Sequence, residues 1–368
     1  MSTFDRLRTL RSTGLRYAVA RLRAERALRA AGRSVSDDFY LRVWSEAANE
    51  LGAEVSELSA RFLQIARGGA STWVWGYRTP LDDRVTLEVA ADKVVSSALL
   101  RGSGVPVPRQ LEFDRGDLAS AATFLERERA ACVVKPAGGT GAGKGVTTWV
   151  QSHADLHAAA DRAGRLSARL IIEEQVAGDV FRLIFLDGEL LDAVRSRPPT
   201  VTGNGRATVR RLVYAENRRR LAARGDAGLA ILRLDLDSRL TLRRQGYTLG
   251  SVLPAGARVA VKTVSNQATI DDKETVRTPI SPALVADCAT AVAALRLRLA
   301  GVDLIAPDIA RPLAESGGRI AEVNGTPGLH HHYNVADRAN VTRVAVPILE
   351  RLLDDAALRP SPPGVRET

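Results

Sequence analysis

Five lysines stand out as candidates for chemistry, because arginine is the basic residue used almost everywhere else in the sequence. The 368 residues contain 52 lysines and arginines together, and the lysines are Lys93, Lys135, Lys144, Lys262 and Lys273. A lysine ammonium is a compact point charge, whereas an arginine guanidinium is a wide planar fork, so a tight phosphate pocket distinguishes the two. Four of the five lysines lie within the motifs described below, which is consistent with a phosphate site.

The first motif is a glycine-rich loop that follows a short apolar stretch. Residues 133–146 read VVKPAGGTGAGKGV, with Lys135 at the end of a predicted strand and five glycines between positions 138 and 145. Glycine lets the backbone approach a polyphosphate closely, so that successive N–H groups form a nest for anions. The loop is not a Walker A motif, because Gly145 stands where Ser or Thr is required. On this motif alone, a flexible structural loop is the alternative.

Acidic residues stand at the ends of further apolar stretches that we predict to be strands. Residues 170–176 read LIIEEQV, and residues 301–328 place Asp303, Glu322 and Asn324 at the ends of two predicted strands. Glu322 and Asn324 are two residues apart, so they point to the same face of a strand. Carboxylate and amide oxygens are the hard ligands that Mg²⁺ takes when it also holds phosphates. An exposed sheet with an acidic face is the alternative interpretation.

The elements that must position these motifs alternate between strands and helices, which predicts an α+β fold. The expected strands are 131–136, 169–176, 301–305 and 319–324, the expected helices are 155–167 and 282–299, and 181–199 is a hairpin turning at Asp187 and Gly188. Before them we expect a basic amphipathic helix over 1–33, a helix over 37–52, a hairpin over 55–77 and a helical stretch over 84–104.

This order of elements indicates three parts. We expect a small N-terminal helical and hairpin subdomain over 1–85, a nucleotide-binding domain over 86–355 with a lid at about 115–175, and a flexible tail over 356–368. Within the second part, a C-terminal antiparallel sheet is expected to carry the late acidic motif.

Composition excludes several classes of protein. No stretch approaches the roughly 20 apolar residues of a membrane span, and the N-terminus lacks the apolar core of a secretory signal, so the expected location is the cytoplasm. Cys132 and Cys288 fall in a predicted strand and a predicted helix, which favours buried thiols over a disulfide. The net charge of +10 raises the possibility of nucleic-acid binding, but the aromatic content of 5% argues against a single-strand binder.

In this order, a strand lysine, a glycine-rich loop, a strand ending in Glu and a late Asp…Glu-x-Asn set resemble the ATP-grasp carboxylate–amine ligase family. The likeness is strongest to the ATP-grasp module of cyanophycin synthetase, and it is weaker to D-alanine–D-alanine ligase and the glutathione-synthesising module of bifunctional enzymes. It runs from about Thr72 to Leu353, and its most specific passages are GNGRATVRRLV, RRQGYTLGSVLPAG, GVDLIAPDIARPL and AEVNGTPGL.

The resemblance implies roles for the nucleotide-binding and metal-binding residues. Lys93 and Lys135 would hold the α- and β-phosphates under a mobile loop of Gly138, Gly139, Thr140, Gly141, Gly143, Lys144 and Gly145. The adenine and ribose edge would be Glu173, Glu174, Gln175 and Val176. Two Mg²⁺ ions, or Mn²⁺ in their place, would be held by Asp303, Glu322 and Asn324, with Asp308 as the runner-up for the first ligand.

The same resemblance implies a substrate side. Its catalytic residues would be Arg182, Arg195, Lys262 and Asn266, with the three histidines at 330–332 nearby or filling a loop. The segment VKTVSNQATIDDKETV matches the family at Lys262 and Asn266 but lacks its glycines, so the identity of the substrate does not carry over.

The expected activity is formation of an amide or peptide bond through an acyl-phosphate, with release of ADP and phosphate. The substrates would be a small-molecule or peptide carboxylate and an amine, with an amino acid or peptide supplying the carboxylate that is activated. A homodimer is one candidate assembly, and neither nucleic acid nor a membrane is an expected partner. An ATP-grasp kinase-like or non-catalytic nucleotide-binding module is the first alternative, and a basic nucleic-acid-binding protein is the second.

Overall fold

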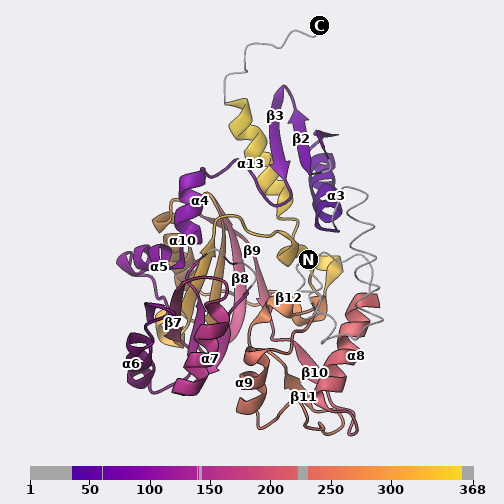
Figure 1. Ribbon diagram of the computed structural model, residues 1–368. Coiled ribbons are helices and arrows are strands. Elements are labelled where there is room, and N and C mark those ends of the chain that lie inside the picture. Colours follow the sequence, from indigo (N-terminus) through magenta and orange to yellow (C-terminus); the bar gives the residue numbers. More distant parts are fainter. Residues whose placement is uncertain (1–34, 60, 139, 141–142, 223–230, 359–368) are drawn as a thin grey trace.

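The computed structural model describes residues 35–59, 61–138, 140, 143–222 and 231–358. Helices and antiparallel sheets are mixed along the chain, and Figure 1 shows them gathered into an upper part, a central sheet and two lower parts. The helix expected over 1–33 and the tail beyond residue 358 lie outside the described residues.

The upper part joins the beginning of the described chain to its end. Helix α3 (Val35–Glu50) and strands β1 (Glu54–Glu57), β2 (Phe62–Arg67) and β3 (Ala70–Trp75) pack with α13 (Ala345–Ala357). The expected hairpin is confirmed as β2 and β3, and β1 adds a third strand. Trp44 is fully buried and donates its indole N–H to the carbonyl of Gly76 at 2.8 Å. One hydrophobic cluster therefore joins the two ends of the described chain.

The helical stretch expected over 84–104 is two helices, α4 (Arg84–Ala91) and α5 (Lys93–Gly102). Asp92 between them has an extended backbone and accepts hydrogen bonds from the backbone N–H groups of Val94 and Val95. An aspartate that caps a helix in this way satisfies donors that the helix leaves open. The break places Lys93 at the first position of α5.

The lower left part of Figure 1 is an antiparallel sheet with strand order β4-β7-β5-β6. Its strands are β4 (Gln110–Asp114), β5 (Cys132–Pro136), β6 (Thr147–Val150) and β7 (Arg169–Glu174), and α6 (Ala119–Glu128) and α7 (His153–Ala163) pack on it. The glycine-rich loop connects β5 to β6. We call this part the lid sheet.

The central sheet has the strand order β12-β9-β8-β13-β14, with every neighbouring pair antiparallel. Its strands are β8 (Asp179–Leu186), β9 (Glu189–Ser196), β12 (Lys273–Thr275), β13 (Leu299–Ala306) and β14 (Arg319–Asn324). The predicted turn at Asp187 and Gly188 is confirmed, and both residues have positive φ, as a two-residue hairpin turn requires. Helix α11 (Leu313–Ser316) precedes β14.

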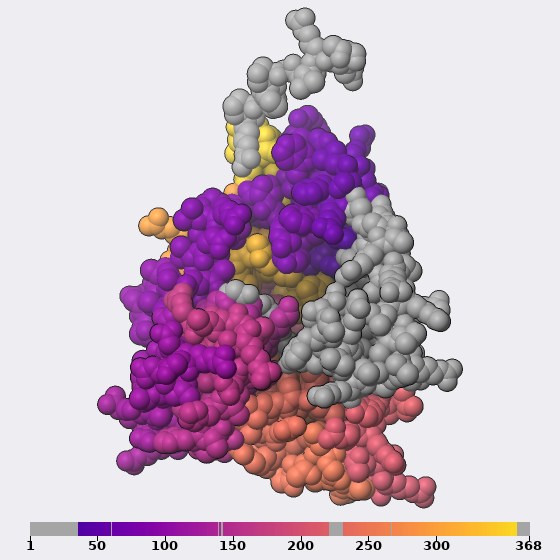
Figure 2. Space-filling model, in the orientation of Figure 1, coloured from indigo at the N-terminus to yellow at the C-terminus, as the bar shows by residue number. Residues whose placement is uncertain are grey.

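The lower right part lies between β9 and β12 in the sequence. It contains β10 (Thr200–Thr202), α8 (Val209–Ala222), α9 (Leu236–Arg244) and β11 (Arg258–Ala260), followed by the short helices η1 (Ser265–Gln267) and η2 (Ile270–Asp272). In Figure 2 the surface is hollowed between the indigo N-terminal part and the magenta lid sheet, and the golden C-terminal part is seen at its floor. After β14 come α12 (His330–Tyr333) and η3 (Arg338–Asn340).

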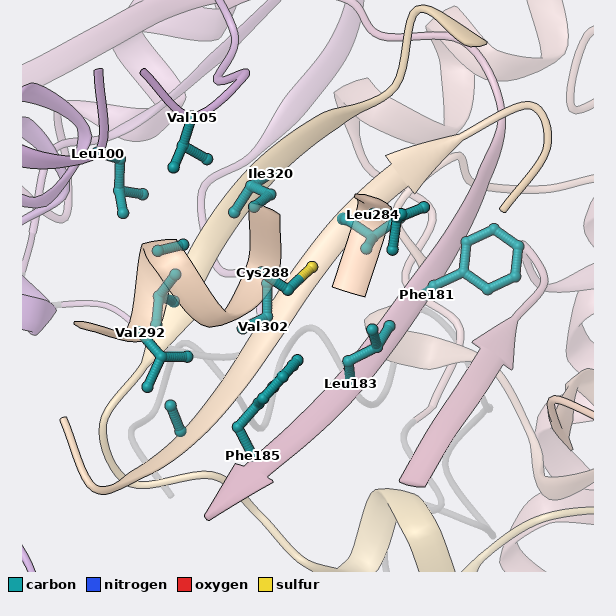
Figure 3. Packing of buried hydrophobic residues seen from close by; sticks show 14 of the residues in the cluster. Leu100, Val105, Phe181, Leu183, Phe185, Leu284, Cys288, Val292, Val302 and Ile320 are labelled. Atoms are coloured by element: carbon teal, nitrogen blue, oxygen red, sulfur yellow. The ribbon is translucent and has the colours of Figure 1, made fainter. Parts of the chain in front are cut away.

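Helix α10 (Pro282–Ala294) packs against one face of the central sheet. Figure 3 shows Phe181, Leu183 and Phe185 of β8 directed toward the same cluster as Leu284 and Cys288 of α10. Because side chains alternate along a strand, the residues between these apolar ones point to the opposite face. No helix in the described residues is long and apolar enough to cross a membrane.

Candidate active site

A row of charged residues crosses the face of the central sheet that α10 leaves open. Arg182 of β8 is the register partner of Asp303 of β13, and Asp303 is the partner of Glu322 of β14. Partners in neighbouring strands share a face of the sheet, so the three side chains emerge together. Asp303 lies inside its strand and not at the end, where the sequence placed it. We call this surface the active face.

Direct contacts hold the row together. The Arg182 Nε–H donates to Oδ1 of Asp303 at 2.6 Å, and the amide of Asn324 donates to the other Asp303 oxygen at 3.1 Å. Desolvation opposes the charge of Arg182, but Asp303 outweighs it and raises the pKa of Arg182 above its ordinary value. Glu322 and Asn324 lie on the same face of β14, as their two-residue spacing predicts.

Two lysines from distant segments reach the β14 end of the row. Lys93 forms an ion pair with Glu322, and Nζ of Lys135 lies 2.7 Å from Oε2 of Glu173. Desolvation raises the pKa of Glu322, but the charges of Lys93, then Lys135 and Arg182, hold it below its ordinary value. Three cations thus converge on one carboxylate, which is an arrangement suited to a polyanionic ligand bridged by metal.

The glycine-rich loop begins beside these lysines. The backbone N–H of Lys93 donates to the carbonyl of Ala137 at 3.2 Å, so helix α5 starts where the loop leaves β5. Gly143 and Gly145 have positive φ, and a side chain at Gly145 would meet Pro136 at 2.8 Å. Among the other predicted loop residues, Gly138 and Thr140 are partly buried and Lys144 is exposed, whereas Gly139 and Gly141 lie outside the described residues.

The segment predicted to meet adenine and ribose is the end of β7 and the residues after it. Glu173 is the register partner of Val133 in β5, next to Lys135. Glu174 forms ion pairs with Arg109 and Arg319, which occupies its carboxylate. Oε1 of Gln175 accepts from the backbone N–H of Trp149 at 3.3 Å, and Val176 is partly buried. Of these residues, Glu173 contacts Lys135, and the contact of all four with the base is a prediction.

The residues proposed as metal ligands divide into two groups. Asp303, Glu322 and Asn324 lie together on the active face, and their three oxygen-bearing side chains suit Mg²⁺. Asp308 lies beyond the end of β13, is exposed, and accepts a hydrogen bond from the backbone N–H of Ala310 at 2.9 Å. Within the described ranges no group of three or more His, Cys, Asp or Glu side chains is arranged to hold a metal ion.

Two predicted catalytic residues lie away from this row. Arg195 is the register partner of Phe181, whose ring packs in the α10 cluster, so Arg195 belongs to the opposite face of the sheet and pairs there with Asp179 and Glu274. Lys262 is 3% exposed. The side chain of Asn266 is outside the described part, and its backbone lies in η1.

Lys262 lies in a buried network that we call the lysine joint, made of Lys262, Asp235, Asp237, Arg162 and Thr148. Nζ of Lys262 is 2.7 Å from Asp235 and 3.4 Å from Asp237. Arg162 of α7 pairs with Asp235 at 2.7 Å, and Asp237 accepts from both the backbone N–H and the hydroxyl of Thr148. The joint therefore fastens the lid sheet to α9.

A further cluster lies at the β12 end of the active face. Lys273 approaches His331, with 3.4 Å between Nζ and Nδ1, and the Tyr40 hydroxyl lies 3.1 Å from Nδ1 of His330. Burial, followed by the charges of Lys273 and Arg182, lowers the pKa of His330 to about 3. Burial also lowers the pKa of His332, although its hydrogen bond with Asp192 opposes this. Sequence reasoning missed Tyr40, because an aromatic residue in an amphipathic helix carries no signal beyond packing.

Comparison with known proteins gives relatives for most of the chain, although no family profile matches it. It is 33% identical over 288 residues to a cyanophycin synthetase of a Nostoc species, which covers 77% of this chain and 32% of the relative. It is 34% identical over 290 residues to the glutathione biosynthesis bifunctional protein GshAB of Streptococcus mutans, covering 76% of this chain and 38% of the relative. The chain thus spans only about a third of each relative.

A solved structure shares the fold. A bifunctional glutathione synthetase from Pasteurella multocida superposes with a TM-score of 0.54 and 23% identity, covering 85% of this chain and 43% of that chain. The predicted α+β architecture is therefore confirmed, and so is the predicted likeness to these two groups of enzymes.

Proposed function

This chain has the ATP-grasp fold and is a homologue of part of the cyanophycin synthetases and GshAB proteins, and from this premise we propose that it is an ATP-dependent carboxylate–amine ligase. It forms an amide or peptide bond through an acyl-phosphate and releases ADP and phosphate. Its substrates are amino acids or small peptides, the class of compound on which ligases of this family act.

The observation that carries the proposal is the convergence of Lys93, Lys135 and Arg182 around Glu322, with Asp303 and Asn324 alongside. A protein that only bound an anion would need the cations but not the carboxylates. Carboxylates held among cations fit a ligand that brings its own metal, as ATP does. The homologous enzymes use ATP and a divalent metal, and we propose two Mg²⁺ ions here.

The residues of the active face divide the work of phosphoryl transfer. Lys93 and Lys135 bind phosphate oxygens, and the loop over residues 138–145 covers them and excludes water. A divalent cation on Asp303, Glu322 and Asn324 neutralises charge on the phosphates when it is bound. Arg182 lies next to Asp303 and attracts the carboxylate that is to be activated. Positioning and charge neutralisation supply most of what this chemistry requires.

The proposed reaction has two steps. An oxygen of the substrate carboxylate attacks the γ-phosphorus of ATP, the bond from that phosphorus to the β–γ bridging oxygen breaks, and ADP leaves. The nitrogen of the amine then attacks the carbonyl carbon of the acyl-phosphate, the carbon–oxygen bond breaks, and inorganic phosphate leaves while the amine loses a proton. The cations of the active face stabilise the negative charge that develops on the acyl oxygen in the second step.

The test is the nucleotide product formed with a panel of amino acids and dipeptides. We expect ADP and phosphate to appear only with a cognate carboxylate, and hydroxylamine to trap the activated acid as a hydroxamate. Formation of AMP and pyrophosphate would overturn the acyl-phosphate. ADP release that never depends on an amine or hydroxylamine would favour the kinase-like alternative on the same fold.

Location and assembly follow as further proposals. Without a helix long enough to span a membrane among the described residues, and with small charged substrates, we propose that the enzyme works in the cytoplasm. We propose that it acts independently of nucleic acid, since its charge is scattered and its aromatic content is 5%. Sedimentation with and without ATP will show whether it is a homodimer.

A further inference from the structure

Lys273, the fifth lysine of the sequence, lies on β12, at the edge of the central sheet opposite β14. Thr275 of β12 is the register partner of Val194, and Val194 is the partner of Arg182. Lys273 is two residues before Thr275, and residues two apart in a strand share a face. Lys273 therefore belongs to the same face as the row of charged residues, although it lies on the edge strand.

The ammonium of Lys273 has no carboxylate partner among the described residues. Within that part of the chain, the ammonium has one hydrogen-bonding neighbour, His331, at 3.4 Å between Nζ and Nδ1. Arg182 acts on it with a charge of the same sign. Asp272, the adjacent residue, attracts it, but Oδ2 of Asp272 already accepts hydrogen bonds from the backbone and hydroxyl of Thr269, both at 2.8 Å.

Three other lysines of the described chain are buried or partly buried, and each has its charge matched. Lys93 pairs with Glu322, Lys135 with Glu173, and Lys262 with two aspartates. An ammonium removed from water without a partner is costly, and it shifts its pKa to compensate. Burial, followed by the charge of Arg182, accordingly lowers the pKa of Lys273 to about 8. A bound anion would remove this cost.

We propose that Lys273, with His331 beside it, binds a substrate carboxylate that is not the one phosphorylated. The site of phosphorylation lies at Asp303 and Glu322, and β12 is three strands away from β13. At about 4.8 Å per strand, the backbones of these two strands are about 14 Å apart, so a carboxylate bound at Lys273 lies apart from one held beside Asp303. The substrate class is an amino acid or peptide with a free carboxylate remote from the reacting group, and this identification rests on the proposed ligase function.

Chemical labelling tests the site without requiring turnover. Lys273 is acetylated with succinimidyl acetate at pH 7.5 and followed by mass spectrometry, with the exposed Lys144 as the internal reference. The probes are the amino acids and glycyl dipeptides of the substrate panel, each beside its C-terminal carboxamide. We expect at least one acid to slow the acetylation of Lys273 relative to Lys144, and its carboxamide to have no effect. Equal protection by acid and carboxamide, or protection by no acid, would overturn the proposal whether or not the protein is a ligase.

Steady-state kinetics with a cognate acid test whether the charge of Lys273 contributes to binding that acid. Lys273→Met should lower kcat/KM for the acid roughly 10- to 100-fold, the range of a charge-assisted hydrogen bond, while KM for ATP stays within about twofold. Arg197→Met is the matched control, because it removes an exposed cation one residue from the register partner of Lys273. Equal losses for the acid and for ATP would assign Lys273 a structural role.

The pH dependence of kcat/KM distinguishes a binding role of Lys273 from a packing role. Free Lys273 loses its proton as the pH rises through about 8, so kcat/KM for the acid should fall above that pH in the native protein. Arginine keeps its charge in this range, so Lys273→Arg should remove the fall. The charged neighbours of Lys273 are Arg182 and Asp272, and its titratable neighbours are His330 and His331. A fall that persists unchanged in Lys273→Arg would contradict the proposal.

Discussion

Lys262 and Lys273 are eleven positions apart in one sequence motif, yet they lie in opposite electrostatic surroundings. Lys262 is enclosed in the lysine joint between Asp235 and Asp237. Lys273 faces Arg182 and neutral histidines, and no carboxylate pairs with it among the described residues. Lys262 is almost fully buried between two carboxylates, so its charge contributes to structure, whereas the open charge of Lys273 is available to a ligand. The family resemblance implied a substrate role for Lys262, whereas its buried contacts with Asp235 and Asp237 favour a structural role.

The lysine joint also explains how the lid sheet is held. Asp237 is fully buried and accepts two hydrogen bonds from Thr148, which lies in β6 just after the glycine-rich loop. Arg162 reaches Asp235 from α7 of the same sheet. The loop therefore emerges from a sheet that is fixed to α9 by buried charges.

The largest expected effect is on catalysis at the active face. Glu322→Gln keeps the shape of the side chain but removes its charge, so ADP release should fall roughly 10³- to 10⁴-fold, or about 4–5.5 kcal/mol. Asp308→Asn, the runner-up ligand, is the control and should retain most of the activity. Stopped-assay ADP measurement decides between them, and the reverse order of effects would transfer the metal role to Asp308.

The next effect is on stability at the lysine joint. Lys262→Met removes the ammonium that pairs with both Asp235 and Asp237, and breaking a buried ion pair in this way costs about 3 kcal/mol or more of unfolding free energy. Lys273→Met removes a charge that has no partner, so it should change that free energy by less than about 1 kcal/mol. Urea unfolding of both variants measures the contrast. Equal losses of stability would erase the distinction between the two lysines.

The histidines beside Lys273 give a pH dependence. Burial, then Arg182, holds the pKa of His331 well below the ordinary 6.5, so this ring stays neutral in the folded protein but gains a proton when unfolded in mild acid. The unfolded state therefore binds more protons below pH 6.5, and folding stability falls as the pH falls. For one histidine the slope approaches about 1.4 kcal/mol per pH unit. Urea unfolding between pH 7.5 and 5 should show a shallower slope in His331→Asn than in the native protein.

The smallest expected effect is within the lysine joint. Thr148→Val removes the hydroxyl that donates to Asp237 at 2.7 Å but keeps the backbone N–H that donates at 3.0 Å. The loss should be about 1 kcal/mol, as for a single hydrogen bond. Thermal unfolding measures it, and a loss as large as that of Lys262→Met would mean that the threonine and not the lysine dominates the joint.

Much of the fold was predictable because its signals are local. The alternation in β8 and β9, the Asp187–Gly188 turn and the two-residue spacing of Glu322 and Asn324 all follow from neighbouring residues. The break at Asp92 was missed, since the surrounding residues favour one continuous helix and only the capping role of the aspartate divides it. The sequence did not predict that Arg195 lies on the opposite face of the central sheet, because a short motif does not specify strand register.

The sequence by itself determined where phosphate and metal chemistry could occur, through glycines, lysines and carboxylates in a recognisable order. Only the tertiary structure decided which charges are matched. Lys93 meets Glu322 across 229 positions of sequence, and Lys262 meets its aspartates from another subregion. Electrostatic energy depends on distance in space and on burial, and neither is written in the spacing of residues along a chain. For that reason the open charge of Lys273 became visible only when the strands were brought together.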